Sequence, residues 1–225
     1  MKRLPIGITT LQSIKKDNCY YVDKTHFVKK LVDNGKYFFL SRPRRFGKSL
    51  FVDTLKQAFL GNKELFEGLY LEKNWDWSVK YPVIHIDFGG GFVKDQQDLK
   101  EWIIRQLKHH KLIYNLEVEE TNNIRFMFND LIFNLYNTFK NPVVVLVDEY
   151  DKPILDNIEN TEKAIEIRDI LKDFYSVLKT AEPYLKFVFL TGVSRFSKVS
   201  IFSGLNQLQD ITISPTFATI CGYTQ

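Results

Sequence analysis

Two short segments of the chain are apolar at every position, VVVLV at 143–147 and FVFL at 187–190. A strand with one face in water alternates apolar and polar residues, whereas a strand covered by helices on both faces is apolar throughout. Helical patterns alternate with these and three further β-rich runs along the chain. Strands that alternate with helices become parallel neighbours joined by right-handed crossovers. The sequence therefore predicts an α/β three-layer sandwich on a mostly parallel sheet of about five strands.

The expected elements place the candidate functional residues. The expected strands are 36–41, 81–88, 142–148, 185–192 and 209–214, and the expected helices are 48–60, 95–112, 124–139 and 161–181. Thr161 is the expected N-cap of the last helix. Ligands of such folds lie at the carboxyl ends of the strands. Candidate residues are therefore those that directly follow FFLS, HIDF, VLVD and VFLT.

Composition limits the class of protein. The 225 residues are 44% hydrophobic and 26% charged, which is ordinary for a globular chain. A net charge of +4 favours anionic ligands but does not by itself predict nucleic-acid binding. We expect one nucleotide-binding domain over 1–225, with 1–35 as an extension packed on it. The charge-free end, TFATICGYTQ, suggests the front part of a longer protein.

Cysteine usage and hydropathy indicate the compartment. Cys19 and Cys221 are far apart and show no metal-binding spacing, and two thiols in a chain of this size are typical of a reducing environment. The N-terminus lacks the apolar stretch of a signal peptide, and no run approaches the roughly 20 apolar residues of a membrane helix. The expected location is the cytoplasm.

The segment SRPRRFGKSL at 41–50 links the first expected strand to the first expected helix. Unpaired N–H groups and the helix dipole make such a helix start a phosphate site. Gly47 allows close backbone approach, Lys48 can reach the outer phosphates, and the Ser49 hydroxyl can bind Mg²⁺. The alternative is a glycine turn before a basic helix start, although cations there oppose the helix dipole. The expected nucleotide-binding residues are Arg42, Pro43, Arg44, Arg45, Phe46, Gly47, Lys48, Ser49 and Leu50.

The loop departs from the usual G-x-x-x-x-G-K-[ST] pattern at its first position, where Arg42 replaces glycine. A residue before proline is pushed toward extended geometry, so Arg42 can prolong the strand. Pro43 then fixes the turn that a glycine would otherwise make through its flexibility.

Two carboxylates follow the strand VVVLV. Asp148 is the expected Mg²⁺ ligand opposite Ser49, and Glu149 is the expected base that polarises the attacking water. Acidic residues also end many strands at turns, and YDKP is a good turn sequence, so that alternative stays open. The extra strand between the two motifs indicates the class of P-loop NTPases that uses such a glutamate. The expected strand order is 5-1-4-3-2.

The fourth expected strand ends at Thr191, between the phosphate-loop strand and the Asp148 strand. Thr191 is expected to contact the attacking water or the terminal phosphate, or else only to cap its strand. Arg195 is a candidate sensor of that phosphate, whereas Lys198 reads better as solvated surface charge. The three glycines of DFGGGF at 87–92 indicate a plain turn or a mobile loop over the nucleotide. His109 and His110 are adjacent and therefore do not form a helical metal pair.

Five stretches together resemble the AAA-ATPase-like family of bacterial and archaeal proteins. They are LPIGITTLQSIKKDNCYYVDKTHFVKKL, SRPRRFGKSLFVDTL, YPVIHIDF, VVVLVDEYDKPIL and LKFVFLTGVSRFSKVSIFSGLNQLQDITI. The family's own loop reads R-P-R-R-F-G-K-[ST], so the resemblance implies that the arginine entrance is a family trait. It also implies ATP as the nucleotide and a following PD-(D/E)xK nuclease-like domain.

The resemblance further implies an adenine pocket before the first strand, for which Tyr21, Val22, Asp23 and Lys24 are candidates. In the alternative interpretation, Val22, Phe27 and Leu31 form a stripe that docks on the domain. The expected function is Mg²⁺-dependent ATP binding and hydrolysis that drives or gates an effector domain. The alternatives are a slow nucleotide-dependent switch and a nucleic-acid-associated binding module. Oligomeric state is left open.

Overall fold

The computed structural model describes residues 2–117, 121–194, 201–202 and 205–222. Its strands are β1 (Tyr37–Ser41), β2 (Val83–Asp87), β3 (Val143–Asp148), β4 (Leu185–Gly192) and β5 (Gln209–Asp210). All paired strands are parallel, and the order is β2-β3-β4-β1-β5. This is the expected order 5-1-4-3-2 read from the opposite edge. The α/β fold with a parallel five-stranded sheet is confirmed.

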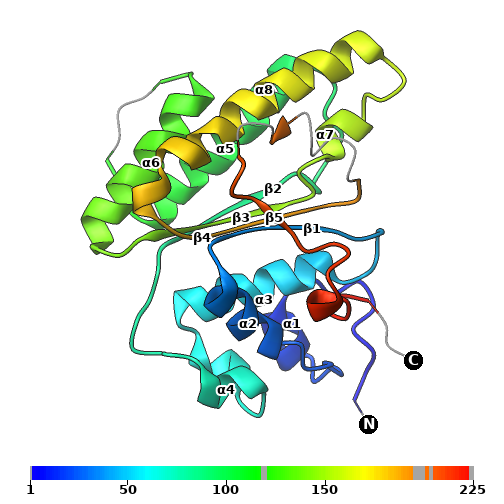
Figure 1. Ribbon diagram of the computed structural model, residues 1–225, viewed down its shortest axis with the longest axis vertical. Coiled ribbons are helices and arrows are strands. Elements are labelled where there is room, and N and C mark those ends of the chain that lie inside the picture. The colour runs from blue at the N-terminus through cyan, green and yellow to red at the C-terminus, as the bar shows by residue number, and fades with distance from the viewer. Residues whose placement is uncertain (1, 118–120, 195–200, 203–204, 223–225) are drawn as a thin grey trace.

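Helices cover both faces of this sheet (Figure 1). One layer holds α5 (Gln96–Ile113), α6 (Ile124–Phe139), α7 (Lys152–Leu155) and α8 (Thr161–Thr180). The other holds α1 (Leu11–Lys16), α2 (His26–Asn34), α3 (Lys48–Leu60) and α4 (Tyr70–Asn74). Short 3₁₀ turns are η1 (Lys63–Phe66), η2 (Glu182–Tyr184) and η3 (Pro215–Phe217). No helix in the described part of the chain is both long and apolar enough to cross a membrane.

The apolar strands follow from this layering. Alternate residues of a strand point to opposite faces, so Phe39 and Val145 pack in the cluster with α5, α6 and α8. Their neighbours Phe38 and Leu146 pack in the cluster with α1, α2 and α3. Because both clusters exclude water, every position of β3 is buried.

Two sequence predictions about element ends were wrong. The side chain of Asn160, not Thr161, caps α8 by accepting a hydrogen bond from the Lys163 N–H at 3.1 Å. The predicted strand 209–214 pairs as a strand only at Gln209–Asp210. The reason is a local turn, in which the Asp210 carboxylate accepts a hydrogen bond from the Thr212 N–H at 2.9 Å.

The segment before β1 shares the core of the α3 face. Leu11, Phe27 and Leu31 are buried there, and the buried carboxylate of Asp53 in α3 accepts the Leu11 N–H at 2.7 Å. Val22 is 74% exposed. Of the three residues of the predicted docking stripe, Phe27 and Leu31 are therefore buried and Val22 is not.

The free edge of β2 is covered by a stripe of α5 side chains spaced four residues apart. These are Trp102, Gln106, His110 and Tyr114. The N–H groups of Val83, His85 and Asp87 donate to Tyr114 Oη at 2.7 Å, His110 Nε2 at 3.1 Å and Gln106 Oε1 at 2.7 Å. Trp102 Nε1 donates to the Asp87 carbonyl oxygen at 3.0 Å. The stripe takes the place of a sixth strand at the N–H groups of these residues.

Candidate nucleotide-binding site

The loop between β1 and α3 has the backbone of a phosphate cradle. The Arg42 N–H still pairs with the Gly192 carbonyl oxygen at 3.1 Å, so Arg42 prolongs the strand as expected. Arg45 and Gly47 both adopt left-handed backbone, with φ of 65° and 84°. A methyl group on Gly47 would meet no atom within 4 Å, so the approach to the start of α3 is open. The first turn of α3 therefore offers its N–H groups to a ligand.

Lys48, the first residue of α3, folds back into this loop. The side chain is only 5% exposed. Its ammonium donates to the carbonyl oxygens of Arg42 and Pro43, both at 3.0 Å. The cation therefore lies inside the loop, on the side where a phosphate would approach the helix start.

The two acidic residues end β3 at the same edge of the sheet. The Asp148 side chain is buried, and its Oδ1 accepts hydrogen bonds from the Thr191 hydroxyl and from the Glu149 N–H, the latter at 3.1 Å. Glu149 has left-handed backbone, with φ of 54°. β4 alone separates their strand from β1, which carries the phosphate loop.

The electrostatics of Glu149 join the two segments. Burial is the largest cause that raises the pKa of Glu149, followed by the negative charge of Asp148. Lys48 lowers this pKa, Asp87 raises it and Arg44 lowers it. These causes agree with the sheet order, which puts the cationic loop and the carboxylates at the same edge of the sheet.

Arg42 is engaged elsewhere through its side chain. Its guanidinium donates to the carbonyl oxygens of Ser41 at 3.0 Å and Thr212 at 2.6 Å, and more weakly to those of Phe217 at 3.4 Å and Ala218 at 3.5 Å. The Thr212, Phe217 and Ala218 carbonyl groups belong to the segment that follows β5. In this structure the Arg42 side chain thus fixes residues 212–218 to the loop, while its backbone helps to hold Lys48.

The remaining loop residues divide between the surface and the C-terminal segment. Pro43, Arg44 and Arg45 are exposed. The Phe46 carbonyl oxygen accepts the Gly222 N–H at 2.8 Å. The C-terminal segment therefore touches the phosphate loop at both of its ends.

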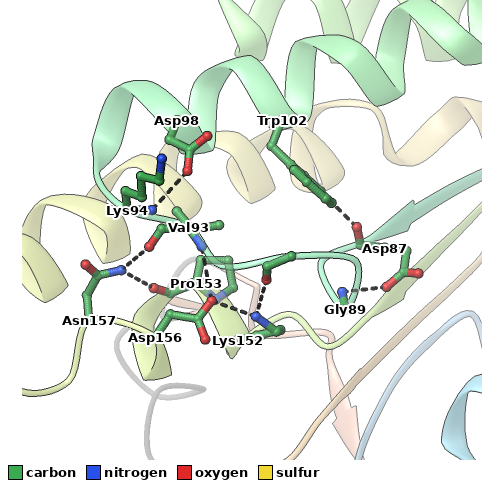
Figure 2. Close-up of polar contacts among 11 residues, drawn as sticks. Asp87, Gly89, Val93, Lys94, Asp98, Trp102, Lys152, Pro153, Asp156 and Asn157 are labelled. Carbon is green, nitrogen blue, oxygen red and sulfur yellow. Dashed lines mark hydrogen bonds and ion pairs between the residues drawn. The ribbon is translucent and has the colours of Figure 1, made fainter.

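The glycine turn after β2 lies beside Glu149, and Figure 2 shows the polar contacts that hold this turn. A methyl group on Gly89 would lie 3.3 Å from the Glu149 carboxylate oxygen Oε2. Lys152 donates to the Gly91 carbonyl oxygen, and Asn157 Nδ2 donates to the Val93 carbonyl oxygen at 2.7 Å. These bonds favour the fixed turn over the mobile loop among the two sequence-based interpretations.

Comparison with known proteins identifies the family of the chain. The family model described as "Predicted AAA-ATPase" matches residues 5–202 of the chain. The chain belongs to the predicted AAA-ATPase family. It is also 49% identical over 225 residues to a protein of Azotobacter chroococcum mcd 1 described as "Uncharacterized protein in vnfD 5'region". That match covers 100% of this chain and 43% of the relative.

Other candidate residues of this AAA-ATPase-like chain have partners that the sequence did not reveal. Thr191 is fully buried, and its hydroxyl donates a hydrogen bond to Asp148. Arg195, the candidate phosphate sensor, and Lys198, expected to be solvated surface charge, lie outside the described residues. The sequence analysis passed over Asp151, whose fully buried carboxylate accepts hydrogen bonds from the N–H groups of Val193 and Ser194. Its only signal was a further acidic residue two positions after the Asp-Glu pair.

The proposed adenine residues contact α4 and the C-terminal segment. Asp23 accepts the N–H groups of Thr25 at 2.8 Å and of Tyr70 at 2.6 Å, and Lys24 donates to the Thr219 carbonyl oxygen. Tyr21 lies with its hydroxyl 3.4 Å from Thr54 Oγ1 on α3. These contacts leave the adenine role a prediction.

The donor set suits Mg²⁺ only if a phosphate completes it. Ser49 at the start of α3 and Asp148 across the sheet supply hard oxygen atoms, which Mg²⁺ prefers. Among the described residues, no group of three or more His, Cys, Asp or Glu side chains could hold a metal ion. Mg²⁺ is commonly held by one or two protein oxygens together with substrate phosphates and water. The residues present fit that mode of binding.

Proposed function

We propose that this domain binds Mg²⁺·ATP between the 42–49 loop and the acidic end of β3 and hydrolyses the β–γ bond. The observation that carries the proposal is geometric: the cationic loop follows β1 and the Asp148–Glu149 pair ends β3, at one edge of a parallel sheet with only β4 between the two strands. Membership of the predicted AAA-ATPase family supports use of a nucleoside triphosphate. The preference for ATP over GTP rests on the family alone.

The loop would hold the triphosphate through its backbone and its cations. Its N–H groups and the first turn of α3 would take phosphate oxygens. Lys48 would leave the Arg42 and Pro43 carbonyl oxygens, to which it is bonded at 3.0 Å, and turn to the outer phosphates. Arg44 and Arg45, both exposed, would add positive charge beside them.

Ser49 and Asp148 would hold the Mg²⁺ ion. When bound, the ion would neutralise charge on the β- and γ-phosphate oxygens. The Thr191 hydroxyl and the Glu149 N–H both donate to Asp148 Oδ1, which fixes the orientation of this carboxylate. Asp148 would therefore meet the ligand without having to reorganise.

Glu149 would act as the general base. Its raised pKa makes it a better proton acceptor than an ordinary glutamate. A water oxygen would attack the γ-phosphorus as the bond from that phosphorus to the bridging oxygen breaks. The water proton would pass to the Glu149 carboxylate, and ADP would leave with the bridging oxygen.

A melting curve with and without Mg²⁺·ATP tests the binding step. At about 100 times the dissociation constant, binding adds roughly 2.7 kcal/mol, a rise of about 5–10 °C for a domain of this size. Lys48→Ala should remove most of that rise, whereas Lys63→Ala, an exposed lysine in η1, should keep it. No rise and no phosphate release from the unmodified protein would overturn the proposal. Tight binding with phosphate release at background would indicate a slow switch instead.

An effector domain, driven or gated by the nucleotide, is part of the same proposal. The chain spans 43% of the relative from A. chroococcum, and the family resemblance implies a nuclease-like domain after the ATPase. Bonds from Arg42 to Thr212 and from Phe46 to Gly222 give the loop a route to the C-terminal segment. In a full-length protein, effector activity should differ between ATP and ADP, and Lys48→Ala should abolish the difference. Salt-dependent DNA binding that survives Lys48→Ala would favour a nucleic-acid module instead.

A further inference from the structure

Asp151 is a buried carboxylate that the proposed chemistry does not use. It is 0% exposed, three residues beyond Asp148. Such a group is costly to bury unless hydrogen bonds compensate for lost water. Asp151 Oδ2 accepts the Ser194 N–H at 2.5 Å and the Val193 N–H at 3.1 Å. Burial raises the pKa of Asp151, whereas these two N–H groups and the more distant Lys48 lower it.

The bonds of Asp151 belong to a longer series that joins the turn after β3 to the end of β4. The Tyr150 N–H donates to the Thr191 carbonyl oxygen at 2.9 Å, and the Tyr150 hydroxyl donates to the Ser194 carbonyl oxygen at 2.8 Å. The Thr191 hydroxyl donates to Asp148. Asp148, Tyr150 and Asp151 thus each form hydrogen bonds to the segment 191–194, and Glu149 takes no part in this series.

Gly192 is required for this contact by close approach. A methyl group there would lie 2.7 Å from Asp151 Oδ1 and still closer to the ring of Tyr150. The Tyr150 and Asp151 side chains are both buried and held by hydrogen bonds, so neither can move away at low cost. The close packing of Asp151 and Tyr150 against β4 therefore requires glycine at position 192.

Glu149 lies between the two anchored carboxylates and carries the strain of the turn. Its φ of 54° is left-handed, which costs a residue other than glycine on the order of 1–3 kcal/mol. Such a conformation persists only where the surrounding contacts enforce it. Hydrogen bonds hold Asp148, the residue before Glu149, and Asp151, the second residue after it. The backbone of Glu149 therefore has little freedom.

We propose that Asp151 is a positioning residue for the hydrolysis. By holding Val193 and Ser194, it keeps the 148–151 turn in the conformation that presents the Glu149 carboxylate beside Gly89 and toward Lys48. This inference rests on the proposed ATPase function. Asp151 would not contact the nucleotide. The rate of hydrolysis would therefore depend on Asp151, whereas the affinity for the nucleotide would not.

Asp151→Asn tests this assignment with little change in size. The Val193 N–H also donates to Asp151 Oδ1 at 3.2 Å, and an amide nitrogen at that position cannot accept it, so this anchor bond is lost. We expect kcat to fall on the order of 10–100-fold, as for other misplaced catalytic groups, while the Kd for Mg²⁺·ATP changes less than about threefold. Gly192→Ala should disrupt the same contact from the β4 side. It should likewise lower kcat and leave the Kd for Mg²⁺·ATP nearly unchanged.

Asp53→Asn is the matched control. Asp53 is also buried and accepts backbone and side-chain hydrogen bonds, from the Leu11 N–H at 2.7 Å and Gln57 Nε2 at 3.0 Å. Its loss should lower the melting temperature without lowering kcat of the folded protein. Wild-type kcat in both Asp151→Asn and Gly192→Ala, or a loss of kcat in Asp53→Asn as large as in Asp151→Asn, would overturn the inference. An unmodified protein without turnover would instead overturn the proposed function, and this inference with it.

Discussion

The hydroxyl of Thr191 donates a hydrogen bond to the buried carboxylate of Asp148. The two residues end neighbouring parallel strands, β4 and β3, and Thr191 is also aligned with Leu40 on β1. The bond therefore sits at the centre of the carboxyl edge of the sheet, between the phosphate loop and the acidic turn. It makes Thr191 a partner of the proposed metal ligand, in addition to any contact with water or phosphate that the sequence suggested.

Thr191→Val should separate this bond from simple packing, because valine has the same shape without the hydroxyl. We expect a loss of about 1–2 kcal/mol of unfolding free energy, since Asp148 Oδ1 keeps only the Glu149 N–H. We also expect half-maximal turnover to need more Mg²⁺. The measurements are melting curves and phosphate release over a Mg²⁺ titration. Thr191→Ser, which keeps the hydroxyl, should retain the wild-type Mg²⁺ requirement; an equal shift in both variants would contradict the role.

Glu149→Gln should bind Mg²⁺·ATP without hydrolysing it and should melt at a higher temperature than the unmodified protein at pH 7–8. The pKa of Glu149 is raised above its ordinary 4.5, so its ionised form is less favourable in the folded than in the unfolded chain. Removing that charge stabilises the fold above the shifted pKa, and the difference should vanish once the pH falls below 4.5.

The same raised pKa should appear in the pH dependence of the unmodified protein, as an acidic limb of kcat centred above pH 4.5. Phosphate release and melting curves across pH check both expectations. Glu159→Gln, an exposed control, should change neither quantity. A lower melting temperature for Glu149→Gln at pH 8 would show that Glu149 is not electrostatically strained.

Local pattern was sufficient for most of the fold. The all-apolar runs located β3 and β4, and helical periodicity located α3 and α6 with the bounds that the structure has. Strand–loop–helix order placed the loop at the carboxyl edge of the sheet. The predictions of Thr161 as an N-cap and of 209–214 as a strand were wrong because of nearby polar residues. Asn160 caps α8 instead of Thr161, and Asp210 forms a turn that ends β5. Such choices depend on single hydrogen bonds that periodicity does not encode.

The missed features of the site are contacts between residues distant in sequence. Asp151 pairs with Ser194 across 43 positions, and Arg42 pairs with Thr212 across 170. Neither partner carries a motif, because the acceptors or donors are backbone groups that every residue has. The sequence could therefore predict the charged residues of the proposed nucleotide site, but not which of them hold backbone segments in position.

Arg42→Ala should destabilise the C-terminal segment more than it weakens nucleotide binding. Its guanidinium holds the Thr212 carbonyl oxygen at 2.6 Å and reaches those of Phe217 and Ala218. We expect a loss of about 1.5–3 kcal/mol, the range for hydrogen bonds from a charged group, and faster amide exchange over 211–222. Arg42→Lys should recover only part of the loss, because an ammonium lacks the planar fork.

Arg44→Ala provides the converse control for Arg42. Arg44 is exposed, so its removal should leave the unliganded melting temperature unchanged and reduce the rise caused by Mg²⁺·ATP. Loss of that rise in Arg42→Ala, with unchanged amide exchange at 211–222, would instead place the Arg42 side chain on the phosphates.

Stability should fall as the solution is acidified from about pH 6.5 to pH 4, because of His110 on the β2 edge. Burial, the largest cause, lowers the pKa of His110 to about 4, and nearby His85, Lys56 and His109 lower it further. A hydrogen bond that the protonated ring can donate to the His85 carbonyl oxygen opposes this shift. Between these values the unfolded chain binds a proton that the folded chain does not, so each step toward acid favours unfolding. The full effect is about 3 kcal/mol, and His85, whose pKa burial also lowers, acts in the same direction.

His110→Gln should flatten this part of the pH dependence, because glutamine does not titrate but can still accept a hydrogen bond from the His85 N–H. His109→Gln is the matched control, since His109 is the adjacent residue on α5 and is exposed. Urea unfolding at a series of pH values from 4 to 8 measures the slope for the three proteins. The wild type and His109→Gln should share one slope and His110→Gln should have a smaller one. Equal slopes in all three would mean that the imidazole of His110 is not held neutral against the edge of β2.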